Sequence, residues 1–145
     1  MPVKSPRLSL PVDGIEADLL AAVAAGRPVI VCAEPGSGKT TRVPPMLLRS
    51  PAVTGRALVL QPRRLATRLV AERVAGEMGE AVGQTVGYQT RHEKALSDAS
   101  RIVFMTEGLF LRHLLSRPTL PGVDAVVMDE FHERSLSLDM ALGFV

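Results

Sequence analysis

The sequence predicts an α/β fold with a mostly parallel, doubly wound sheet and helices on both faces. Short apolar runs alternate along the chain with segments whose apolar residues recur at helical spacing, and this alternation is typical of βαβ units. The runs 28–33 and 123–128 stand out, because a loop of small residues follows the first and Asp129-Glu130 follows the second. We expect an extended lead-in over 1–13 and a single domain over 14–145, since domains commonly contain about 100–200 residues.

Composition narrows the classes of function and the location. The formal net charge of +2 gives no overall basic field of the kind that binds nucleic acid. Five arginines nevertheless gather in one stretch: Arg56, Arg63, Arg64, Arg68 and Arg73. The single cysteine, Cys32, cannot form an internal disulfide and suits a reducing compartment. No signal peptide is recognisable and no apolar run approaches the length of a membrane span, so we expect a cytoplasmic protein.

The first elements are predicted to be a helix and a buried strand. Asp13 suits the cap of a helix of about 14–25, which Gly26 would end. The apolar residues of this helix share one face: Ile15, Leu19, Leu20 and Val23. The apolar run 28–33 that follows is predicted to be a fully buried parallel strand, with Cys32 inside it.

The loop after this strand is predicted to bind nucleotide phosphate. A strand, a loop of small residues ending in Gly-Lys-Thr, and a helix together make the P-loop arrangement. Gly36 and Gly38 lack Cβ, so the backbone can turn successive N–H groups toward an anion, and the helix adds its positive N-terminal end. Lys39 is expected to reach the β- and γ-phosphates, and the Thr40 hydroxyl is placed to ligate Mg²⁺.

The other residues expected to line this nucleotide site are Glu34, Pro35, Ser37 and Thr41. The usual motif begins with Gly, and this chain has Ala33 there. Ala is small enough to leave the cradle intact, although the strict motif is lost. Taken alone, such a loop is also compatible with a simple glycine-rich turn before a helix.

The middle of the chain is predicted to continue the alternation of helices and strands. Pro44 and Pro45 predict a short helix after the loop, a kink, and then a second helical piece over 46–49. A strand is expected over 56–61 and a helix over 62–78. The apolar residues of that helix recur at helical spacing and predict its core face: Leu65, Ala66, Leu69, Val70, Val74 and Met78.

The second half of the chain is predicted to contain three more strands. Residues 85–91 alternate as a half-exposed strand would, 92–100 look like a loop, and 102–105 form a continuous apolar strand. Thr106 suits the cap of a helix that turns Leu109, Phe110 and Leu114 inward. The run 123–128 is predicted to be a buried strand, and the apolar spacing over 133–145 predicts a helix.

The acid pair at the end of the last strand complements the phosphate loop. Asp129 can hold Mg²⁺ beside Thr40, usually through water. Glu130 can orient and deprotonate an attacking water. A kinase must exclude water whereas a hydrolase needs a base to activate it, so the pair favours hydrolysis of a nucleoside triphosphate.

Five blocks of sequence carry a family pattern. They are Ala33 to Thr41, Gln61-Pro62-Arg63-Arg64-Leu65-Ala66, Val86-Gly87-Tyr88-Gln89-Thr90-Arg91, Thr106-Glu107-Gly108 and Asp129-Glu130-Phe131-His132-Glu133-Arg134-Ser135. In this order they resemble motifs I, Ia, Ib and II of the DEAH/RHA helicases of superfamily 2. The chain looks most like the bacterial HrpB-type ATP-dependent helicases.

The resemblance implies a RecA-like domain that binds ATP and Mg²⁺ and moves on single-stranded nucleic acid, more often RNA than DNA. By motif position, Lys39 and Thr40 would bind phosphate and metal, Asp129 the metal, and Glu130 would be the catalytic base. His132 would link the nucleotide site to the nucleic-acid site. Residues expected to contact the sugar-phosphate backbone are Arg63, Arg64, Arg91, Thr106 and Gly108. Arg73 matches a position where relatives stack an arginine on the nucleotide base, and an exposed pairing with Glu77 is the alternative.

The same resemblance predicts that parts of the motor are missing from this chain. The family places a Ser-Ala-Thr strand between the phosphate-loop strand and the Asp-Glu strand, and no such motif follows 129–135. The second RecA-like domain with its arginine finger is also expected to be absent. We therefore expect a truncated domain with a gap in its sheet, which alone binds nucleotide weakly, hydrolyses it poorly and unwinds nothing.

Two other functions remain compatible with the residues. A small-molecule kinase would explain the phosphate loop but not Asp129-Glu130-Phe131-His132. A truncated nucleic-acid-binding module without catalysis would keep the fold but not the chemistry. The preference for RNA or DNA, the polarity of unwinding, the target and the oligomeric state stay open at this point.

Overall fold

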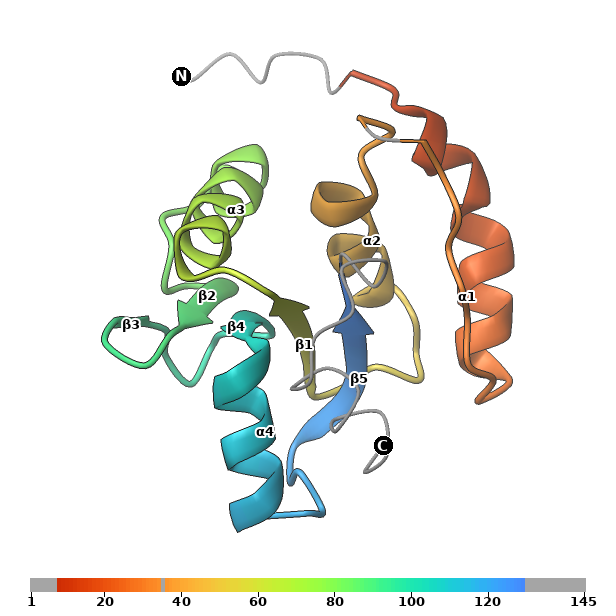
Figure 1. Ribbon diagram of the computed structural model, residues 1–145. Coiled ribbons are helices and arrows are strands. Elements are labelled where there is room, and N and C mark those ends of the chain that lie inside the picture. Colours follow the sequence, from red (N-terminus) through yellow and green to blue (C-terminus); the bar gives the residue numbers. More distant parts are fainter. Residues whose placement is uncertain (1–7, 35, 130–145) are drawn as a thin grey trace.

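A five-stranded sheet lies at the centre of the part of the chain that the structure describes (Figure 1). This computed structural model describes residues 8–34 and 36–129. The elements in chain order are η1 (Pro11–Ile15), α1 (Glu16–Ala24), α2 (Lys39–Leu47), β1 (Arg56–Gln61), α3 (Arg64–Glu77), β2 (Val86–Gln89), β3 (Lys94–Ala95), β4 (Ile102–Thr106), α4 (Glu107–Ser116) and β5 (Val123–Met128).

The sheet is mostly parallel, as the sequence predicts. Its strand order is β3-β2-β4-β1-β5. β1 pairs in parallel with β4 on one side and β5 on the other, and β2 pairs in parallel with β4. The two-residue β3 is antiparallel to β2 and lies within the segment 92–100 that the sequence predicts to be a loop. The four longer strands therefore end at the same edge of the sheet.

Helices cover both faces of this sheet because successive strand residues point to opposite sides. On one face, α3 packs through Ala71, Val74 and Ala75 on strand residues such as Val59 and Phe104. On the same face, α2 packs through Val43 and Met46 beside Ala57, with η1 and α1 outside it. On the other face, α4 inserts Phe110 and Leu114 among Leu58, Leu60, Val103 and Met105. The inward residues predicted for α4 are thus confirmed.

The predicted core face of α3 is partly wrong. Leu65 is 68% exposed, Leu69 is 52% exposed and Met78 also lies at the surface, whereas Val74 is buried as predicted. The buried stripe instead runs through the small residues Thr67, Ala71 and Ala75. Small side chains allow the helix to approach the sheet closely. The spacing of hydrophobic residues alone therefore does not determine which side of the helix packs on the sheet.

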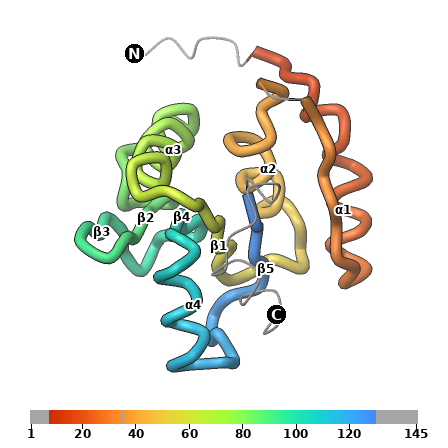
Figure 2. Tube along the Cα trace, in the orientation of Figure 1, coloured from red at the N-terminus to blue at the C-terminus, as the bar shows by residue number. Residues whose placement is uncertain are grey.

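The predicted strand 28–33 is not part of the sheet. No described strand pairs with this segment, which runs beside α1 and apart from β5 (Figures 1 and 2). Ile30 is 90% exposed and Cys32 is also exposed, so the prediction of a buried strand is wrong. An apolar run becomes a strand only where a neighbour pairs with its backbone N–H and C=O groups. β5, the described strand at this edge of the sheet, is itself half-buried rather than buried.

Three other local predictions need correction. α2 runs without interruption from 39 to 47 with Pro44 and Pro45 inside it, rather than as two pieces. β2 is mostly buried, not half-exposed, because α3 covers it. The predicted helix of 14–25 is divided into η1 and α1, and Asp13 accepts the N–H of Leu10 at 2.8 Å instead of capping α1. The predicted helix over 133–145 lies outside the described residues.

Candidate nucleotide and nucleic-acid site

The carboxyl edge of the sheet gathers most of the predicted site residues. Gln61 lies beside Thr106 in the β1–β4 register, and Leu60 lies beside Met128 in the β1–β5 register. β2 ends next to Met105 of β4. The turns that follow these strands therefore form one row along the edge. The predicted site residues in this row, in strand order, are Arg91, Thr106, Arg63 and Asp129.

The phosphate loop has the backbone turns that its glycines suggest. Gly36 and Gly38 have φ angles of 79° and 93°, in the region that favours glycine. Gly38 precedes α2, so Lys39 and Thr40 stand in the first helical turn, where free N–H groups and the helix dipole favour an anion. Figure 1 shows the start of α2 and the arrowhead of β5 at the same end of the sheet.

The side chains of the loop are held in part by the loop itself. The Lys39 ammonium donates a hydrogen bond of 2.8 Å to the carbonyl of Ala33, which closes the turn. Thr41 is buried, and its hydroxyl lies 3.4 Å from the carbonyl of Gly38. Glu34 is an exposed residue, and its backbone carbonyl accepts a hydrogen bond of 3.1 Å from the N–H of Ser37. Lys39 thus reaches a phosphate only by giving up or sharing its contact with Ala33.

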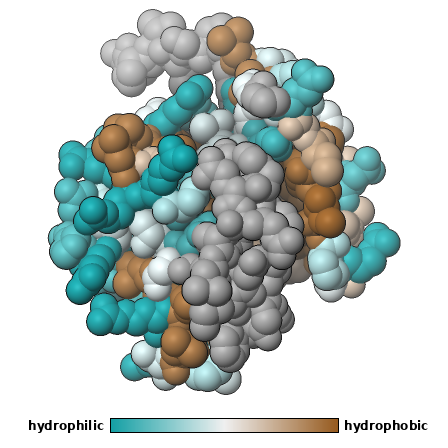
Figure 3. Space-filling view, viewed as in Figure 1, coloured by the Kyte–Doolittle hydropathy of each residue, from teal (hydrophilic) through white to brown (hydrophobic). Residues whose placement is uncertain are grey.

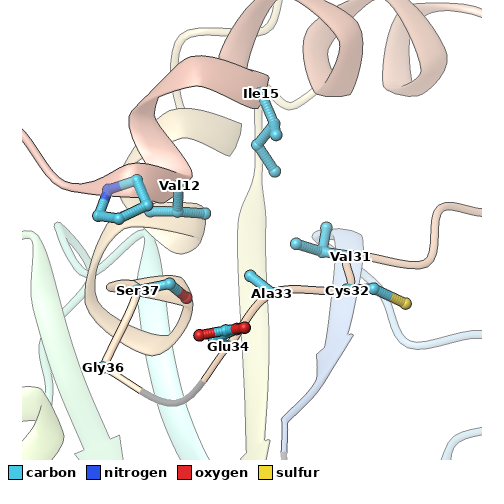
Figure 4. Close-up of a pocket in the computed structure, with 9 residues that line it drawn as sticks. Val12, Ile15, Val31, Cys32, Ala33, Glu34, Gly36 and Ser37 are labelled. Atoms are coloured by element: carbon cyan, nitrogen blue, oxygen red, sulfur yellow. The ribbon is translucent and has the colours of Figure 1, made fainter.

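A cavity of about 370 Å³ opens between this loop and η1 (Figure 4). Val12 and Ile15 line it on one side, and Val31, Ala33 and Ser37 line it on the other. The Ser37 hydroxyl is buried and has no hydrogen-bond partner among the described residues. A buried hydroxyl without a partner is costly, so Ser37 favours a polar occupant of the loop.

Asp129 immediately follows β5 and is positioned by β1. Gln61 is buried at the end of β1, and its side-chain amide donates a hydrogen bond of 2.5 Å to the Asp129 carboxylate. The N–H of Asp129 donates to the carbonyl of Leu60 at 3.2 Å. Asp129 is half-buried, and β5 ends at the end of the sheet where α2 starts (Figure 1).

The donor atoms at this edge suit magnesium. Thr40 offers a hydroxyl and Asp129 a carboxylate, both hard oxygen donors of the kind that Mg²⁺ prefers. No group of three acidic, histidine or cysteine side chains that would hold a metal unaided exists among residues 8–34 and 36–129. A magnesium ion shared with substrate phosphates needs no such group, since one or two protein ligands commonly suffice.

The predicted nucleic-acid residues are accessible along the rest of the edge. Arg63 stands at the N-cap position of α3, Arg64 is the first residue of the helix, and both residues are exposed. Arg91 follows β2 and is exposed. Thr106 is half-buried at the start of α4, and Gly108 is exposed in the first turn of that helix. These five residues belong to three neighbouring strand ends, as a shared backbone-binding surface requires.

Arg73 adopts the surface pairing that the sequence offers as its alternative. Its guanidinium Nε lies 3.3 Å from Glu77 one helical turn later, and the side chain is exposed. Arg68 makes the same kind of pair with Glu72, whose hydrogen bond and charge raise the pKa of the arginine. The predicted residues Pro35, Glu130 and His132 lie outside the described residues.

The sequence alone does not identify two residues of the site region. Gln61 belongs to one of the motifs, but only the structure reveals that its amide fixes Asp129. Arg42 is a buried arginine in α2. The sequence signal is a polar residue at the end of an apolar strand for Gln61, and a charge on the apolar face of a short helix for Arg42.

Residues 14–139 match the profile of the DEAD/DEAH box helicase family. The chain belongs to this family. The family relationship accounts for the order of the sequence blocks and for a parallel sheet whose carboxyl edge carries them.

The DEAD/DEAH helicase relatives include bacterial and eukaryotic proteins. The chain is 42% identical over 137 residues to the ATP-dependent RNA helicase HrpB of Escherichia coli (strain K12), an alignment that covers 94% of this chain and 17% of HrpB. It is 37% identical over 150 residues to the probable ATP-dependent RNA helicase DHR1 of Saccharomyces cerevisiae, covering 99% of this chain and 12% of DHR1. The chain thus spans less than a fifth of either relative.

Solved structures agree with this assignment. The crystal structure of Escherichia coli DEAH/RHA helicase HrpB superposes with a TM-score of 0.89 at 42% identity, over 94% of this chain and 17% of that structure. The mostly parallel sheet with helices on both faces is therefore the fold of a helicase domain in this family. Within the described residues, every helix is too short or too polar to cross a membrane.

Proposed function

We propose that this chain forms the ATP-binding part of an ATP-dependent RNA helicase, in which ATP hydrolysis drives movement along single-stranded RNA. The observation that carries the proposal is the common edge of the sheet, where Asp129 directly follows β5, exposed arginines follow β1 and β2, and Thr106 ends β4. The phosphate loop precedes α2 and would supply the remaining part of the nucleotide site. Relatives named ATP-dependent RNA helicases support it.

The proposed roles follow motif position and donor chemistry. Lys39 and the N–H groups of the loop would hold the triphosphate, with Thr40 and Asp129 holding Mg²⁺. Bound there, the metal would neutralise charge that develops on the phosphates. Glu130 would accept a proton from the attacking water. Further roles in the nucleotide site are proposed for Glu34, Pro35, Gly36, Ser37, Gly38, Thr41, Arg73 and His132.

The remaining assignments concern RNA and the whole protein. Residues proposed to hold the sugar-phosphate backbone are Arg63, Arg64, Arg91, Thr106 and Gly108, none of which needs to read sequence. We propose one RecA-like domain over 14–145, and turnover that depends on a second RecA-like domain outside these residues. The lone Cys32 suits a cytoplasmic location.

The experiment is a titration of the 145-residue chain with Mg-ATP, with and without a single-stranded oligoribonucleotide. We expect weak binding that Lys39→Ala reduces by at least roughly 10-fold, because the ammonium is the main positive charge offered to the phosphates. Lys94→Ala is the matched control, since Lys94 is an exposed lysine on β3 at the other side of the sheet. Equal affinities of the wild type and the Lys39→Ala variant would contradict the phosphate site.

The oligoribonucleotide distinguishes the alternatives. RNA that binds the chain and changes its affinity for ATP supports a motor. ATP binding that no polynucleotide alters would favour a small-molecule kinase. RNA binding with no ATP binding at all would favour the non-catalytic module.

A further inference from the structure

A buried arginine lies one turn into the helix that follows the phosphate loop. Arg42 of α2 is only 5% exposed and takes no part in the roles proposed above. Arginine is rarely buried unless its charge is offset and its donors are used. Its surroundings therefore indicate what the residue does.

The guanidinium of Arg42 contacts three residues from two parts of the chain, the segment 8–13 and the end of α3. Nη2 donates a hydrogen bond of 2.7 Å to the carbonyl of Leu8 in the lead-in. Nη1 lies 3.8 Å from the Asp13 carboxylate in η1, and Nε lies 3.9 Å from the Glu77 carboxylate at the end of α3. Nε makes no hydrogen bond to any described residue. The firmest contact is thus with the lead-in, and the two carboxylates offset the buried charge.

The segment that Arg42 holds, residues 8–13, lies against the phosphate loop. The N–H of Val12 donates to the carbonyl of Ser37 at 3.2 Å. Leu10 packs on Gly38 so closely that a Cβ on this glycine would come within 2.5 Å of the Leu10 side chain. The Asp13 carboxylate facing Arg42 also accepts the N–H of Leu10. One network therefore joins Arg42, segment 8–13 and the turn that would hold phosphate.

We propose that Arg42 is a positioning residue of the nucleotide site, which holds segment 8–13 against Ser37 and Gly38 and so fixes the phosphate loop. This inference rests on the proposed function, because it concerns the loop that would bind ATP. Arg42 acts on the phosphate end of the site and not on the base. Its loss therefore weakens binding of any triphosphate by the same factor, whether or not a base is attached.

The test compares Arg42→Met with Arg49→Met in the 145-residue chain. Met keeps much of the length of the side chain and removes the charge and the donors. Arg49 follows α2 and pairs at 2.7 Å with Glu16, which lies in α1 outside segment 8–13 and the loop, and its side chain is 46% exposed. We measure binding of Mg-ATP and of Mg-tripolyphosphate, which has no base. Arg42→Met should weaken both by the same factor, roughly 2- to 30-fold, and Arg49→Met should change neither.

A second readout does not depend on nucleotide. Amide hydrogen exchange of the nucleotide-free chain reports on the Val12 N–H, whose bond to Ser37 joins the segment to the loop. We expect faster exchange of this amide in Arg42→Met and unchanged exchange in Arg49→Met. Arg42→Lys, with its charge on a single nitrogen, should lie between the wild type and Arg42→Met. If Arg42→Met does not fold, Arg42→Lys takes its place in both measurements.

The outcomes separate this inference from the proposed function. If the wild type binds both ligands and the Arg42 variant binds them equally well, the positioning role is overturned while the nucleotide site stands. Weaker binding of Mg-ATP with unchanged binding of Mg-tripolyphosphate would also overturn the positioning role, because that result would mean that Arg42 acts on the base or sugar and not on the phosphates. If the wild type binds neither ligand, the proposed function fails, and exchange at Val12 decides the inference: unchanged exchange overturns it and faster exchange supports it.

Discussion

The carboxylate of Asp124 shows how a single residue can join parts of the chain that are distant in sequence. It accepts hydrogen bonds from the N–H groups of Gly55 and Thr54, at 2.5 and 2.9 Å, and lies 3.2 Å from the Thr54 hydroxyl. The first residues of β5 are thereby fixed to the turn that precedes β1. These hydrogen bonds, led by the one from Gly55, lower the pKa of Asp124, and the charge of Arg101 adds to the effect.

This lowered pKa predicts a pH dependence of stability. A carboxyl whose pKa is lower in the folded state stabilises the fold above its unfolded pKa, about 3.8, and loses that contribution as the pH falls through the folded pKa. We expect Asp124→Asn to be less stable than the wild type at pH 7 and to lose less stability on acidification below about pH 4. Urea unfolding between pH 7 and pH 3 measures both. Parallel curves for the two proteins would show that Asp124 does not carry this dependence.

At the scale of elements, the side of α3 that packs on the sheet differs from the side that hydrophobic spacing predicts. Its apolar residues predict a stripe through Leu65, Leu69 and Val74, yet both leucines are exposed, and Val74 packs on the sheet together with the small residues Ala71 and Ala75. Figure 3 shows hydrophobic surface among hydrophilic side chains on the side of the molecule where α3 lies, and this helix carries the exposed Leu65 and Leu69. Spacing identified the helix, but the choice of face depended on how closely Ala71 and Ala75 let it approach the strands.

The different burial of two leucines gives a direct test of this orientation. Leu69 on α3 is 52% exposed and Leu114 on α4 is 2% exposed. We expect Leu69→Ala to change the free energy of unfolding by no more than about 0.5 kcal/mol. Leu114→Ala should cost about 2–5 kcal/mol, because it removes buried methyl groups and leaves a cavity. Urea unfolding of the two variants under the same conditions provides the comparison, and similar losses would mean that the face predicted from spacing is buried after all.

At the scale of the whole molecule, the sequence predicted the order of elements and the edge that carries the site. Alternating apolar runs and helical spacings gave the parallel sheet, and the rule that such sheets bind ligands at their carboxyl ends located Arg63, Thr106 and Asp129 together. The sequence did not predict the contacts that side chains make between distant parts of the chain. Gln61 reaches Asp129 over 68 positions and Arg42 reaches Leu8 over 34, and no local pattern encodes such pairs.

The segment 28–33, which pairs with no described strand, is the largest departure from the prediction, and its cysteine makes the departure testable. Cys32 would be buried in a central strand, whereas it is exposed in the structure and is the single cysteine of the chain. A thiol reacts when its thiolate is accessible. We expect a chromogenic disulfide reagent to modify the native 145-residue chain at one equivalent, at a rate close to that of the urea-unfolded chain. Cys32→Ser is the blank. A thiol that reacts only after unfolding would mean that this segment is buried as a strand of the sheet. The sheet would then extend beyond β5.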